Sequence, residues 1–145
     1  MAITLSHATT IVDAALEKAR ETGCAPLAVA VLDEGGHLKT FAREDGAGIL
    51  RPQIAFGKAW GALGMGLGSR NFAKRIAEQP GAPSFFNALA AMSEGRVVPV
   101  PGGVLIRDAS KAVIGAVGIS GDTSDKDEAC ALAGIQAAGL VGDTG

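Results

Sequence analysis

Apolar side chains near the start of the chain recur every three or four residues, which is the spacing of one helix face. Thr4 or Ser6 is suited to cap the start of this helix, and Gly23 is placed to end it. We therefore predict an amphipathic helix between these positions. Its apolar stripe consists of Leu5, Ala8, Ile11, Val12, Ala15, Leu16 and Ala19.

In four further segments the apolar residues alternate with polar ones or form short runs, as is typical of β-strands. Residues 26–32 and 38–43 flank the turn sequence DEGGH, and paired glycines take the positive φ values that a tight reversal needs. These two runs therefore predict a β-hairpin. Residues 96–108 and 111–120 predict two or three more strands, with a turn at residues 108–111.

The stretch between the two strand pairs is helical in pattern. We predict a helix from about Leu50 to about Met65, with Pro52 accepted in its first turn, where no intrahelical N–H bond is lost. Ser69 and Ser84 are each suited to start a short helix, the first through Glu78 and the second ending before Gly95.

A last helix is predicted from Ser124 to about Leu140. Ser124 and Asp127 have the spacing of an acidic variant of the capping box, and the tail GDTG is expected to fray. Because strands follow one another without alternating one-for-one with helices, we predict an α+β fold with helices against a single antiparallel sheet. The length of 145 residues favours a single domain over residues 1–145.

Composition excludes several classes of partner. The net charge of −2, the 4% aromatic content and the absence of tyrosine argue against nucleic-acid binding. No apolar run is long enough to span a membrane, and the first twenty residues lack the charge pattern of a signal peptide, so we expect a cytoplasmic protein. Abundant alanine and glycine favour tight packing and a homo-oligomer. Cys24 and Cys130 fit no metal or redox motif and are expected to be reduced and structural.

Lys58 stands out because Arg51 is the only other charge between Leu50 and Leu67. A lysine on such a helix either extends to solvent or lines a pocket, where it pairs with a carboxylate such as Asp127 or Glu128. Gly57, Gly61, Gly64 and Gly68 recur on the same stretch. Since each interior glycine costs a helix roughly 1 kcal/mol, we expect them to allow close backbone contact with the sheet or with a neighbouring subunit.

The sequence GAVGISGDTSDKDE, residues 115–128, places acids directly after a glycine-rich run. The spacing GxxGxxG is neither the dinucleotide fingerprint nor a P-loop, and acids here argue against a phosphate ligand. One interpretation is that Asp122 and Asp125 stabilise the helix dipole. The other is that Asp127 or Glu128 lines a pocket and faces a basic or polar group.

Two histidines and one pair of glycines complete the candidate chemistry. His7 and His37 are the only histidines and cannot form a histidine metal site, although either is chemically able to be an axial heme ligand. Gly102 and Gly103, within PVPGGV, form either a strand entry or a pocket rim where a flat ligand approaches the backbone.

The ordered segments VLDEGGHLKTFAREDGAG, IAFGKAW, PGGVLIRD and IGAVGISGDTSDKDEACALAG resemble the GlcG/HbpS-like family, which also forms the C-terminal domain of PduO-type corrinoid adenosyltransferases. The resemblance covers nearly the whole chain. It implies a profilin-like fold with a five-stranded antiparallel sheet flanked by helices, often a homo-oligomer, and heme as a cofactor of some members. The family signature falls on Asp45, Gly46, Lys58, Gly102, Gly103, Gly121, Asp127 and Glu128.

Two functions stay open at this point. The first is a cytoplasmic protein that binds heme or another tetrapyrrole, with His7 or His37 as the iron ligand. The second is a cofactor-independent enzyme of small-molecule catabolism, a lyase, isomerase or hydrolase acting on a small organic acid or aromatic catabolite. In the second, Lys58 anchors a carboxylate or transfers a proton, and Asp127 and Glu128 supply acid and base. The predicted ligand-binding residues are Arg51, Lys58, Gly102, Gly103 and Gly121.

Overall fold

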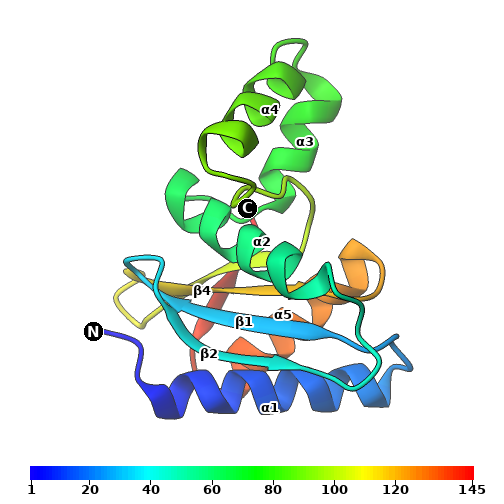
Figure 1. The fold of residues 1–145 in the computed structure, drawn as a ribbon. Helices are drawn as coiled ribbons and strands as arrows, with labels where there is room; N and C mark the ends of the chain where they lie inside the picture. Colours follow the sequence, from blue (N-terminus) through cyan, green and yellow to red (C-terminus); the bar gives the residue numbers. More distant parts are fainter.

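The computed structural model describes residues 1–145 as a single sheet with helices on both sides (Figure 1). The order of the elements along the chain agrees with the sequence prediction, apart from one additional strand at the end. In chain order they are α1 (Leu5–Glu21), β1 (Ala28–Asp33), β2 (Leu38–Arg43), α2 (Arg51–Met65), α3 (Arg70–Glu78), α4 (Ala82–Met92), β3 (Gly103–Arg107), β4 (Val113–Ser120), α5 (Ser124–Ala137) and β5 (Val141–Asp143).

The five strands form one antiparallel sheet in the order β2-β1-β4-β3-β5. The predicted α+β class, with a five-stranded antiparallel sheet flanked by helices, is thus confirmed. In Figure 1, α1 and α5 lie on one side of the sheet and α2 lies on the other. The α3–α4 hairpin extends beyond α2, away from the sheet.

Strand β1 shows how the two sides are built. Successive side chains of a strand point to opposite faces, so Val29 and Val31 join the main core under α1 and α5, whereas Ala28 and Ala30 pack with Ala55 of α2. Strand β2 is different because it forms an edge. Its residues are mostly exposed, with Phe41 at 39%.

Helix α2 lies unusually close to the sheet because small residues meet there. A methyl group added at Gly118 of β4 would be 1.8 Å from the carbonyl oxygen of Ala55. The glycines of this stretch were expected to allow close contact with the sheet or with a neighbouring subunit, but those that make a close contact lie against irregular segments of the chain, with Gly68 against Thr144. Gly57 and Gly61 contact Val98 and Val97, in the segment that precedes β3, while Gly64 has open space around it.

The ends of several elements differ from the prediction. Thr4 caps α1 and forms a capping box with His7, as one of the two predicted caps. Ser124 does not cap α5; Thr123 does, by accepting a hydrogen bond from the backbone N–H of Lys126. Ser69 stands before α3 but its hydroxyl donates to Val100 O and accepts from Gly103 N–H, because this position is needed to hold the loop before β3.

Other boundaries shift for similar reasons. Helix α4 begins at Ala82, two residues before Ser84, and α5 ends at Ala137. The predicted strand over residues 96–108 is confined to β3 because the preceding residues form an irregular segment against α2. The expected fraying of the tail is wrong. Residues Val141–Asp143 pair with β3, and Arg107 binds Asp143 at 2.9 Å.

The two cysteines are both buried and free, and they lie on the α1 and α5 side. Their sulfur atoms are 4.0 Å apart, although 106 residues separate them in sequence. No helix of the protein has both the length and the apolar composition required to cross a bilayer.

Candidate functional site

Lys58 lies in the middle of α2 and is one of the most buried large side chains, with 2% of its surface exposed. Its Nζ donates to the carbonyl oxygen of Ile119 at 2.8 Å and to Oδ2 of Asp127 at 3.1 Å. Asp127 is 1% exposed, and its Oδ1 accepts from the backbone N–H of Asp122 at 3.0 Å. This ion pair ties together α2, the end of β4 and the first turn of α5.

Burial works against both charges of this pair. It lowers the pKa of Lys58, and the attraction of Asp127 offsets only part of that effect. Burial likewise raises the pKa of Asp127, with Lys58 opposing the shift. Each charge therefore depends on its partner, which is the situation in which removal of one partner is costly.

The loop before β3 closes over Lys58. Gly102 has a φ of +119°, and an added methyl group there would be 2.9 Å from Lys58 Nζ. At Gly103 the methyl group would be 2.1 Å from the carbonyl oxygen of Lys58. Gly121 makes a similar close approach to the carbonyl oxygen of Pro26, at 2.3 Å. These predicted ligand-binding glycines thus contact the protein's own backbone, and their role toward a ligand stays a prediction.

Glu128 does not join Lys58, although it neighbours Asp127 in sequence. Its carboxylate accepts from Nε of Arg70, at 2.9 and 3.1 Å, while Arg70 also binds Asp125 through a terminal nitrogen. These bonds raise the pKa of Arg70 further above its already high value. The acids after the glycine-rich run therefore have different partners. Asp122 accepts from the backbone N–H of Ala25 at 2.7 Å and lies 3.8 Å from Nζ of Lys126.

The remaining predicted residues lie apart from one another. Arg51 donates to the hydroxyl of Ser120 at 3.2 Å, and its charge helps to lower the pKa of Lys58. The Nδ1 atom of His7 accepts from Thr4 N–H at the start of α1. His37 is exposed in the β1–β2 turn, with its ring against Gly35. The structure therefore brings Arg51, Lys58 and Asp127 into one neighbourhood and leaves both histidines outside it.

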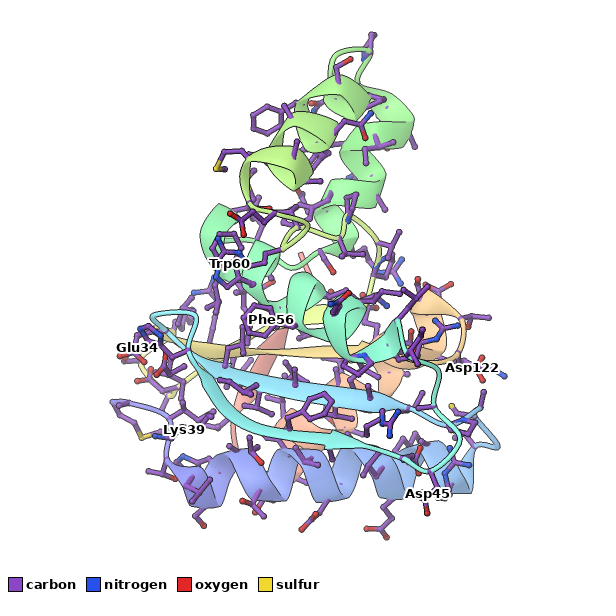
Figure 2. All side chains as sticks on the ribbon, in the orientation of Figure 1. Glu34, Lys39, Asp45, Phe56, Trp60 and Asp122 are labelled. Carbon is purple, nitrogen blue, oxygen red and sulfur yellow. The ribbon has the colours of Figure 1, made fainter.

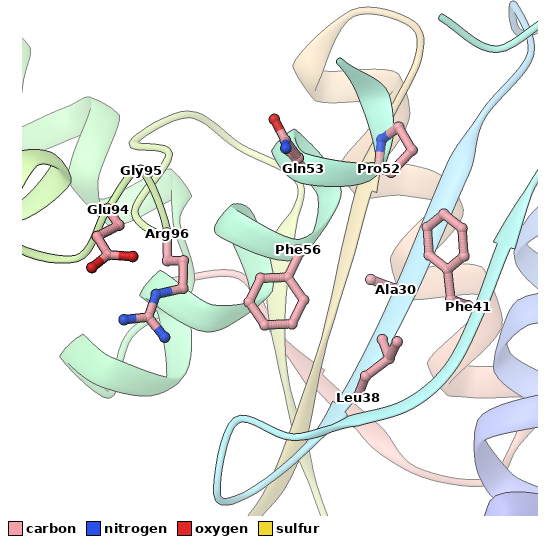
Figure 3. A pocket seen from close by; sticks show the side chains of 9 residues that line it. All are labelled: Ala30, Leu38, Phe41, Pro52, Gln53, Phe56, Glu94, Gly95 and Arg96. Carbon is pink, nitrogen blue, oxygen red and sulfur yellow. The ribbon is translucent and has the colours of Figure 1, made fainter. Parts of the chain in front are cut away.

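A hollow with mainly apolar walls lies elsewhere, between strand β2 and the first turns of α2. It has a volume of about 470 Å³, and we call it the β2–α2 groove. Figure 3 shows the rings of Phe56 and Phe41 on either side of it, with Ala30 and Leu38 between them. Its nine lining residues are Ala30, Leu38, Phe41, Pro52, Gln53, Phe56, Glu94, Gly95 and Arg96.

One rim of this groove is charged. The guanidinium of Arg96 lies 4.5 Å from the centre of the Trp60 ring, and its Nε donates to Ser93 O at 2.8 Å. These two contacts orient the side chain, while its terminal nitrogens have no hydrogen-bond partner in the protein. Glu94 lines the same rim and forms no ion pair with Arg96. Trp60, Phe56 and the β1–β2 turn lie on the same side of the molecule in Figure 2.

Sequence reasoning did not identify this groove. A second hollow of about 460 Å³ has polar and charged walls that include Asp45, a family signature position, and Glu44. No group of three or more His, Cys, Asp or Glu side chains is gathered as a metal site would require. The one available signal for the apolar groove was Leu38 and Phe41 on a strand that otherwise reads as polar.

Comparison with known proteins identifies relatives over nearly the full chain. A family model described as "Haem degrading protein HbpS-like" matches residues 3–136. An uncharacterised 15.0 kDa protein from the dhaT–dhaS intergenic region of Citrobacter freundii is 33% identical over 125 residues, which cover 86% of this chain and 84% of that protein.

Solved structures agree with this match. The crystal structure of a PduOC–heme complex superposes with a TM-score of 0.85 and 26% identity, covering 97% of each chain. The Klebsiella pneumoniae protein ORFY has a TM-score of 0.82 and 29% identity, covering 94% of this chain and 90% of that one. A double mutant of Streptomyces reticuli HbpS has a TM-score of 0.76 and 29% identity, covering 94% and 86%. The chain belongs to the HbpS-like family.

Proposed function

We propose that this member of the HbpS-like family binds heme or a related tetrapyrrole in the β2–α2 groove. Family membership supports the proposal, as does the similarity to PduOC, whose crystal structure is of a heme complex. The observation that carries it is the groove itself, because its walls are mainly apolar and include the rings of Phe41 and Phe56. Its volume of about 470 Å³ lies within the range typical of small-molecule sites, roughly 300–1,000 Å³.

The lining residues fit the ring of a tetrapyrrole. Phe41 and Phe56 offer aromatic faces to a flat apolar macrocycle, and Leu38 extends the apolar wall. Burial of these partly exposed side chains under a ligand is favourable, since each Å² of apolar surface removed from water contributes roughly 25 cal/mol. Arg96 supplies a cation at the rim, where it would bind the carboxylates of such a ligand.

The lining residues do not fit the iron. Proteins hold heme iron with histidine, cysteine, methionine or tyrosine side chains, and none of the nine residues of the groove is of these types. A bound heme would supply a redox-active iron. The residues of the groove account only for binding the ring and its carboxylates.

The alternative of an enzyme centred on Lys58 has no comparable support. A substrate would have to reach an amine that is 2% exposed and already bound to Asp127 and Ile119. Glu128, the second predicted acid or base, is engaged by Arg70. Catalysis by these residues, a cytoplasmic location and assembly into a homo-oligomer stay predictions.

Titration of the purified protein with hemin, followed by the Soret band, tests the proposal. We expect saturable binding at micromolar hemin, and a clear loss of affinity in Phe56→Glu because a carboxylate would then stand in the apolar wall. Phe85→Glu is the matched control, since Phe85 is an exposed phenylalanine of α4 outside the groove. No saturable binding, or equal losses in the two variants, would contradict the proposal.

A further inference from the structure

We infer that the β2–α2 groove recognises the ring and the carboxylates of a tetrapyrrole and not its metal ion. Metal-free protoporphyrin should then bind about as well as heme. This inference rests on the proposed function, which it narrows by naming the parts of the ligand that the chain contacts. The inference follows from two observations: aromatic, aliphatic and basic side chains line the groove, and no side chain able to ligate heme iron does.

Every side chain that is able to ligate heme iron lies away from the groove. His7 belongs to α1, on the opposite side of the sheet, and its Nδ1 accepts a hydrogen bond there. His37 precedes Leu38 by one residue, but its ring lies over Gly35 of the turn. Cys24 and Cys130 are buried in the core under α1 and α5. The chain has no tyrosine, and none of its methionines lines the groove.

The features that do line the groove recognise other parts of a porphyrin. Phe41 and Phe56 stand on either side of the gap, an arrangement suited to a flat aromatic ring whether or not it holds a metal (Figure 3). Leu38, which is 54% exposed, leaves apolar surface available for the same ring. Stacking of this kind depends on the π surface, which the metal-free ring retains.

Arg96 provides the polar half of the recognition. Its stacking on Trp60 and its bond to Ser93 O fix the plane of the guanidinium before any ligand arrives. A fixed guanidinium with free terminal nitrogens matches the geometry of a carboxylate. Glu94 on the same rim opposes part of this attraction, so the carboxylates of the ligand should contact the terminal nitrogens of Arg96 on the side away from Glu94. The preferred ligand class is therefore a planar, apolar ring with carboxylates along one edge.

The experiment compares three probes on the intact chain, namely hemin, metal-free protoporphyrin and the dimethyl ester of that protoporphyrin. Trp60 is the only tryptophan and lies beside Arg96, so quenching of its fluorescence reports binding for all three. We expect hemin and protoporphyrin to have dissociation constants within about threefold of each other. Arg96→Gln should weaken both by about tenfold, as expected for loss of a charged hydrogen bond, and should leave binding of the ester unchanged.

Arg75→Gln on α3 is the matched control, because Arg75 lies outside the groove and has no ion-pair partner. Hemin binding at least thirtyfold tighter than protoporphyrin binding would overturn the inference and leave the proposed function intact. Equal weakening of the diacid and the ester by Arg96→Gln would also overturn it. If no probe binds at all, the proposed function itself fails.

Discussion

The buried pair of Lys58 and Asp127 leads to a specific prediction for Lys58→Met. Methionine fills a similar volume but leaves the Asp127 carboxylate, 1% exposed, without its cation, and the Ile119 carbonyl without its donor. Breaking a buried pair in this way costs about 3–5 kcal/mol. For a chain of this length the midpoint of thermal unfolding should fall by roughly 10–20 °C.

The loss of stability in Lys58→Met should depend on pH, and the titration of Asp127 determines whether it grows or shrinks as the pH rises. Burial already raises the pKa of this carboxyl in the folded protein, and removal of Lys58 takes away the main opposing effect. A group whose pKa is raised on folding binds protons more readily in the folded state, so stability falls as pH rises through the window between its unfolded and folded pKa. The penalty of Lys58→Met should therefore be largest at neutral pH and should shrink as Asp127 becomes protonated in acid.

Denaturant unfolding followed by Trp60 fluorescence measures these effects at 25 °C and a fixed protein concentration. Lys74→Met is the matched control, because Lys74 is exposed on α3 and its loss should change stability by no more than about 0.5 kcal/mol. Adding Asp127→Asn to Lys58→Met removes the stranded charge while keeping an acceptor for Asp122 N–H, so it should restore most of the loss. A single-variant cost below about 1 kcal/mol that does not vary with pH would refute this reasoning.

Three further predictions follow from local contacts. Gly118→Ala should lower the free energy of unfolding by at least 1–3 kcal/mol, roughly the cost of overpacking, because its methyl group would be 1.8 Å from Ala55 O. Gly64 has open space around it, so Gly64→Ala should stabilise α2 by up to about 1 kcal/mol. Denaturant unfolding measures both effects, and equal effects would contradict the packing argument. Thr123→Ala should cost about 1 kcal/mol and Ser124→Ala little, because only Thr123 caps α5; the opposite order in thermal melts would show that the cap is misassigned. Cys24 and Cys130 are both buried, and burial raises the pKa of Cys130 to about 12. Alkylation followed by mass spectrometry should therefore find both thiols protected in the native protein and modified after denaturation; fast native labelling would disprove this protection.

The parts of the fold that the sequence predicted are those with a strong local period. The stripe from Leu5 to Ala19 and the hairpin around Gly35 specify α1, β1 and β2 with little help from the rest of the chain. Strand β5 has only three residues and no apolar alternation. It exists because β3 offers a free edge, and Gly142 permits close packing against Leu132. Pairing between strands that are far apart in sequence cannot be predicted from the few residues of β5 alone.

In the candidate site, too, features visible in the local sequence were predictable, and contacts between distant segments were not. Lys58 was identifiable because a lone cation on an apolar helix has to find a partner, and the closing helix supplies Asp127. Arg70 gave no signal, since a basic residue at the start of an exposed helix is ordinary until Glu128 is brought beside it. The groove was also hidden. It is assembled from residues of β1, β2, α2 and the segment after α4, none of which is unusual on its own.

The close approach of α2 to β4 sets different evolutionary limits on the two sides of the sheet. Beneath α1 and α5, aliphatic residues such as Val29 and Ile135 meet through their side chains, so one branched residue can substitute for another as sequences diverge. Beneath α2, the backbone itself fills the space at positions 103 and 118. At these two positions even a methyl group would force α2 to move away from the sheet. Related proteins that keep the same distance between α2 and the sheet should therefore have glycine at both positions.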